Sequence, residues 1–60
     1  MNNKKFVYAV LETDELYDDT LVIAYFDDYN KAQEKANELN NKSRKYKYDF
    51  YYSVVYTRLD

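Results

Sequence analysis

Two short apolar runs constrain the fold of this chain more than any other feature. Residues 5–11 (KFVYAVL) and 20–26 (TLVIAYF) are rich in β-branched and aromatic residues. Such runs predict strands, and because side chains alternate across a strand, each of these runs is apolar on both faces of its sheet. The chain must therefore build a sheet that has two apolar faces to cover.

The segment after the second run predicts one helix. Its apolar stripe, at helical spacing, consists of Tyr29, Ala32, Ala36 and Leu39. Asp27 is expected at the N-cap and Asp28 in the first turn, where the helix dipole favours negative charge. Asn40 and Asn41 predict the helix end, because Asn often replaces Gly at a C-cap.

Residues 46–59 predict a third strand, longer than the other two. Its aromatic face consists of Tyr46, Tyr48, Phe50, Tyr52, Val54 and Tyr56. The opposite face is mixed, and Tyr51 on that face is the tyrosine for which exposure is most expected.

These elements predict a single α+β domain over residues 1–60, with a three-stranded antiparallel sheet and one helix packed on one face. The order strand, strand, helix, strand favours the sheet order 2-1-3, because this order keeps the most apolar strand in the middle. A third strand parallel to the second is the alternative, and it would leave the first strand at an edge. The loop over residues 12–19 predicts a hairpin, with positive φ at Asp18 or Asp19 because the chain has no glycine.

One helix covers one sheet face, so the second apolar face predicts a protein partner. Monomers rarely expose a large contiguous apolar patch, and a 60-residue chain gains stability from a second copy. We therefore expect a homodimer, formed sheet on sheet or edge on edge through the third strand. The chain has no cysteine and no run that could span a bilayer, which predicts a cytoplasmic protein without membrane contact.

The residues that catalysis and cofactor binding usually need are missing. The chain has no histidine, cysteine or glycine, and neither Ser43 nor Ser53 stands in a nucleophile motif. Capping accounts for Asp27 and Asp28 without a metal ion, because a hard cation needs several converging oxygens. The sequence predicts a binding protein with no enzyme activity, metal or cofactor.

Three groups of residues are candidates for the binding surface. The first is a dimer or partner interface on the third strand, because tyrosine brings large contact area at low entropic cost. The second is a basic segment interleaved with aromatics, as in proteins that bind single-stranded nucleic acid. The third is an acidic loop for a basic partner, with a solvated loop as the alternative. The three groups are Tyr46, Tyr48, Phe50, Tyr51, Tyr52 and Tyr56; Lys42, Arg44, Lys45 and Lys47; and Glu12, Asp14, Glu15, Asp18 and Asp19.

The pattern formed by residues 6–10 (FVYAV), 22–27 (VIAYFD) and 31–36 (KAQEKA), followed by Leu39 and a Tyr-rich strand, resembles the short ββαβ proteins of phages and prophages of low-GC Gram-positive bacteria. The resemblance covers nearly the whole chain. It implies an accessory protein that binds and inhibits or modulates a host protein, such as a defence system, without chemistry of its own. A small binder of single-stranded nucleic acid or nucleotides, using residues 42–48, is the alternative function.

Overall fold

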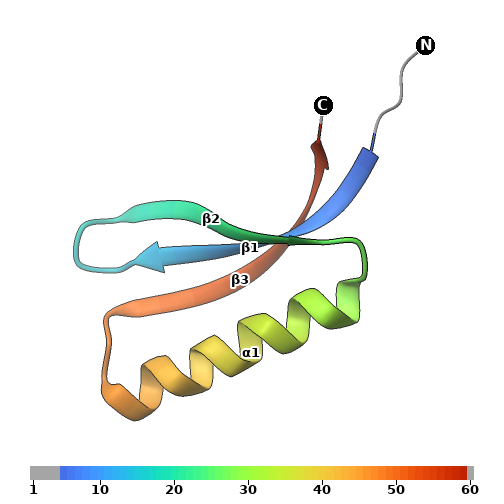
Figure 1. Ribbon diagram of the computed structural model, residues 1–60. Coiled ribbons are helices and arrows are strands. Elements are labelled where there is room, and N and C mark those ends of the chain that lie inside the picture. The colour runs from blue at the N-terminus through green and yellow to red at the C-terminus, as the bar shows by residue number, and fades with distance from the viewer. Residues whose placement is uncertain (1–4, 60) are drawn as a thin grey trace.

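The computed structural model describes residues 5–59, which form a three-stranded sheet with one helix along one side (Figure 1). The strands are β1 (Lys5–Asp14), β2 (Asp19–Phe26) and β3 (Phe50–Leu59), and the helix is α1 (Tyr29–Tyr46). β1 pairs antiparallel with both other strands, so the strand order is β2-β1-β3. The structure confirms the predicted ββαβ arrangement and its order.

The core lies between the sheet and α1 and is small. Val10 in β1 and Ala32 and Ala36 in α1 are completely buried. The partly buried side chains packed around them are Tyr8, Ala24, Phe26, Tyr52 and Val54. Because alanine is small, α1 lies close to the sheet, and the Cα trace measures only 47 × 24 × 11 Å. The described part of the chain is a flat two-layer body.

The helix begins one residue later than the sequence predicts. Asp28 is the N-cap, and its Oδ1 accepts hydrogen bonds from the backbone N–H groups of Asn30 at 2.7 Å and Lys31 at 3.4 Å. Asp27 lies outside the helix, and the first turn contains no acidic residue. The prediction of Asp27 as the cap was therefore wrong by one position, although an aspartate does cap the helix.

The helix also runs further than predicted, through Asn40 and Asn41 to Tyr46. Lys47 is the C-cap in the left-handed conformation (φ 57°), and its N–H donates to the carbonyl of Arg44. β3 consequently begins at Phe50 and has ten residues, the same length as β1, so the prediction of an overlong strand from residue 46 was wrong. Asparagine is a weak helix former, and the contacts of Asn40 and Ser43 with β3, described below, favour the continuation.

The hairpin between β1 and β2 has the predicted positive φ at Asp18 (55°). Further along the same two strands, Val10 pairs with Ala24 and Leu11 pairs with Val22. Ile23 is therefore an extra residue in β2 and forms a β-bulge. The sequence pattern did not predict this bulge, which changes which β2 side chains share a face.

Candidate functional site

The sheet face opposite α1 has no helix or strand packed against it within residues 5–59 (Figure 1). Val10 faces α1, so the alternate residues of β1 face the other way, together with their cross-strand partners. We call this surface the open face. It consists of Lys5, Val7, Ala9, Leu11 and Thr13 of β1, Thr20, Val22 and Tyr25 of β2, and Tyr51, Ser53, Val55, Thr57 and Leu59 of β3.

Lys5, at one end, is the single charged residue among these described positions. One third of the whole chain is charged, so a solvated sheet face of this size would ordinarily carry several charges. The polar members are Thr13, Thr20, Ser53, Thr57 and the two tyrosines, and the hydroxyls of Thr13 and Thr20 lie 3.0 Å apart. The open face is therefore uncharged over nearly its whole length, which is typical of a surface that contacts protein.

The side chains of the open face differ in exposure between its centre and its sides. Ala9 and Val7 on the central strand are buried beneath their neighbours. The outer strands carry the exposed side chains, with Tyr25 at 52% and Tyr51 at 47%. Tyr51 is exposed, as expected, but it does not stand out, because six other tyrosines are more exposed: Tyr17, Tyr25, Tyr29, Tyr46, Tyr48 and Tyr56. Val22 and Tyr25 share this face although they are three residues apart, because the bulge at Ile23 lies between them. If side chains alternated regularly along β2, two residues three apart would lie on opposite faces of the sheet.

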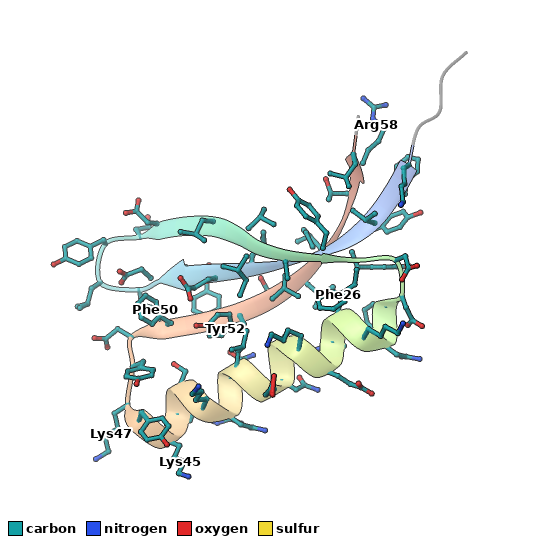
Figure 2. All side chains as sticks on the ribbon, in the orientation of Figure 1. Phe26, Lys45, Lys47, Phe50, Tyr52 and Arg58 are labelled. Atoms are coloured by element: carbon teal, nitrogen blue, oxygen red, sulfur yellow. The ribbon has the colours of Figure 1, made fainter. Side chains whose placement is uncertain are left out.

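Three of the six predicted interface residues lie on the helix side of the sheet instead. Phe50, Tyr52 and Tyr56 share that side, since they pair with Asp14, Glu12 and Tyr8 of β1. Figure 2 shows Tyr52 between the sheet and α1, where it packs against the core. Of the six, only Tyr51 lies on the open face.

Tyr52 is held in place through its hydroxyl, which donates a 2.8 Å hydrogen bond to the Glu12 carboxylate. Desolvation by burial raises the pKa of Tyr52 to about 12, and the hydrogen bond and negative charge of Glu12 add to the effect. Each of these causes favours the neutral phenol. The contact joins β3 to β1 on the helix side and gives Glu12 a structural partner.

Tyr56 belongs to an aromatic cluster near the start of α1. Its ring stacks on Phe6 at 5.3 Å and lies 4.9 Å from Tyr8, and Tyr8 in turn makes an edge contact with Tyr29 at 5.5 Å. Tyr56 nevertheless remains 61% exposed. The cluster lies where β1 and β3 extend past the end of β2, and it stiffens this two-stranded extension.

The predicted basic segment lies on the last turns of α1 and at its cap. Figure 2 shows Lys45 and Lys47 at this end of the helix. The rings of Tyr46 and Tyr48 stack at 5.8 Å, and the Lys45 ammonium lies 5.5 Å from the centre of the Tyr46 ring. Both tyrosines are about half exposed.

The other two basic residues of the segment are on the helix, where Lys42 is exposed and the Arg44 guanidinium donates to the Asn41 side chain. Cations near a helix C-terminus are stabilised by the helix dipole, which is a structural reason for their presence.

The residues of the predicted acidic loop do not form one surface in the structure. Glu12 faces the helix side and binds Tyr52, while Asp14 ends β1 and its Oδ1 accepts the N–H of Leu16 at 3.0 Å. Glu15, Asp18 and Asp19 are exposed at the hairpin. The loop tip is apolar, because Leu16 and Tyr17 are 70% and 75% exposed, and sequence reasoning overlooked both.

Within residues 5–59, no cluster of acidic side chains is arranged to hold a metal ion. The single described helix is also too polar to cross a membrane. No protein-family model, curated protein or solved structure matches this chain. The open face is the surface that spans all three strands of the described sheet.

Proposed function

We propose that this chain is a binding protein without chemistry of its own, and that it contacts a protein partner through the open face. The observation that carries the proposal is the run of uncharged side chains across all three strands, with Lys5 at one end as the exception. A surface that evolved only to face water would interrupt this run with charges.

The chemistry of the open face suits a protein partner better than a nucleic acid or a small anion. Its exposed groups are aliphatic side chains, tyrosine rings and hydroxyls, and Lys5 is its single cation. Phosphate-rich ligands are bound by clustered cations, whereas protein interfaces exclude charge from their centre and favour tyrosine. The resemblance to phage accessory proteins makes a host protein, such as a component of a defence system, the proposed partner.

The proposal is tested by affinity capture from a lysate of a low-GC Gram-positive bacterium with the wild type and two variants. Val22→Lys puts a charge in the open face, where Val22 is 42% exposed. Asn41→Lys is the matched control, because it adds the same charge on the exposed side of α1. We expect the wild type and Asn41→Lys to retain one host protein in stoichiometric amount, and Val22→Lys to lose at least about 90% of it, since a buried unpaired charge costs more than about 1.4 kcal/mol.

Retention of the partner by Val22→Lys at the wild-type level would contradict the use of the open face. Capture of no protein in stoichiometric amount would contradict the binding function itself. Both variants are first compared with the wild type by circular dichroism, so that loss of fold is not scored as loss of binding.

A second function is favoured by the arrangement of Lys45, Tyr46 and Tyr48, which places a cation beside exposed rings as in binders of single-stranded nucleic acid. It is tested by the fluorescence anisotropy of a labelled single-stranded oligonucleotide. Binding by this segment predicts a Kd that rises at least about tenfold between roughly 50 and 200 mM salt, because phosphate contacts release counterions. It also predicts weaker binding for Lys45→Ala than for the control Lys31→Ala at the other end of α1.

A further inference from the structure

The outer edge of β3 is closed along half its length by side chains of α1. The amide of Asn40 makes two hydrogen bonds with Tyr52, whose N–H donates to Oδ1 at 2.8 Å and whose carbonyl accepts from Nδ2 at 2.9 Å. The hydroxyl of Ser43 donates to the carbonyl of Phe50 at 2.7 Å. Asn40 thus occupies the edge at Tyr52 as the peptide group of a neighbouring strand would, and no strand can add there.

The other half of the same edge is open. Tyr52 points its N–H and carbonyl away from β1, and in an antiparallel strand every second residue does the same. The pairing of β1 with β3 has no irregularity, so Val54 and Tyr56 also point their backbone groups outward. The hydrogen bonds from α1 to this edge come from Asn40 and Ser43 in its C-terminal part, and Figure 1 shows the last part of β3 curving away from the helix.

The middle of the open half lacks the features that usually protect a sheet edge. Residues 53–57 (SVVYT) contain no charge and no proline, β3 has no bulge, and Arg58 is the one charged residue of this half. The edge formed by β2 is different, because it carries the bulge at Ile23 and begins with Asp19. One edge is therefore regular and open for pairing, while the other is interrupted.

We infer that two copies of this chain pair edge to edge through residues 54–56 of β3, antiparallel about a twofold axis at Val55. Val54 of each copy faces Tyr56 of the other, and four backbone hydrogen bonds form between the two pairs. The pairing ends at Tyr52, where Asn40 already holds the backbone. Because the axis is twofold and both copies use the same edge, the assembly closes as a dimer and does not grow into a fibre.

The symmetry of the edge supports a second copy as the occupant. A twofold axis at Val55 sets two identical segments against each other, and both are uncharged and regularly paired with their own β1. The dimer also joins the two open faces into one six-stranded surface, which presents the proposed partner site twice.

A single-cysteine variant tests the register, because the chain has no cysteine of its own. In the inferred dimer the two Val55 residues face each other as a non-hydrogen-bonded pair with Cα atoms about 4.5 Å apart, within the range that a disulfide spans. We expect Val55→Cys to form a disulfide-linked dimer in air. Val22→Cys is the control, since Val22 is equally exposed (42%) on the same face but lies on the other outer strand.

Amide hydrogen exchange at two protein concentrations gives an independent test on the wild type. Dimerisation predicts that the amides of Val54 and Tyr56 exchange at least about tenfold more slowly at high concentration than after dilution. The amide of Tyr52 is the internal control, because Asn40 protects it at both concentrations.

Several results would overturn the inference. They are a monomer at all micromolar concentrations in sedimentation, equal exchange of Val54 and Tyr56 at both concentrations, and cross-linking of Val22→Cys in place of Val55→Cys. The last result would show that two copies pack face to face. None of these measurements depends on the host partner, so this dimer and the proposed function can fail separately.

Discussion

Replacing Asn40 by alanine tests whether a helix side chain stabilises the edge of the sheet. The substitution removes both hydrogen bonds to the backbone of Tyr52, at 2.8 and 2.9 Å. A net contribution of about 1 kcal/mol per bond gives a loss of about 2 kcal/mol. Alanine has a higher helix propensity than asparagine by about 0.6 kcal/mol, so the expected net loss is about 1.5 kcal/mol.

This loss is large for a chain of 60 residues, whose total stability is expected to be about 3 to 9 kcal/mol. Urea unfolding followed by circular dichroism measures it from the shift in midpoint at constant slope. Asn41→Ala is the matched control, because Asn41 is the next residue of the same helix, is exposed and does not contact β3. We expect Asn41→Ala to equal or exceed the wild type in stability.

The two variants are thus expected to differ by about 2 kcal/mol in opposite directions around the wild type. Equal stabilities within about 0.5 kcal/mol would refute the argument that Asn40 acts as a substitute for a neighbouring strand. The measurement is made on dilute protein, because Asn40→Ala also frees the edge at Tyr52 and is expected to strengthen pairing between copies at higher concentration.

Three further substitutions test the local contacts. In Tyr52→Phe the loss of the hydrogen bond to Glu12 is expected to cost about 1 to 2 kcal/mol at neutral pH. The folded pKa of Tyr52, about 12, exceeds its ordinary value of 10.0, so this contribution is complete below pH 10 and lost as the pH rises toward 12. A gap between wild type and Tyr52→Phe that stays constant over this window would contradict the assignment. Asp28→Ala should lower the free energy of unfolding by about 1 kcal/mol, while Asp27→Ala should change it by less than about 0.5, and equal effects in thermal unfolding would show that Asp28 is not the cap. Asp18→Val should cost more than about 1 kcal/mol and Asp18→Asn almost nothing, because a β-branched residue disfavours positive φ, and urea titration of the two variants compares them.

The sequence by itself determined the order of the elements and the order of the strands. In residues 5–11 the side chains on both faces of the strand are apolar. Such a strand is expected in the middle of a sheet, with a neighbouring strand on each edge, and β1 holds that position. The absence of glycine assigned the left-handed turn position to an aspartate, and Asp18 has that conformation. These predictions succeeded because each depends on residues close together in the chain.

The tertiary structure decided where α1 ends, which face of β3 is covered and where the sheet edge is open. Asn40 and Asn41 look like a helix end in the sequence, but α1 continues to Tyr46, and Asn40 and Ser43 both form hydrogen bonds with β3. The bulge at Ile23 moved Val22 and Tyr25 onto one face, and the register of β3 turned Tyr52 toward α1. Each of these outcomes depends on groups from strands and helix that are distant in sequence, and their hydrogen bonds exist only once the layers have packed.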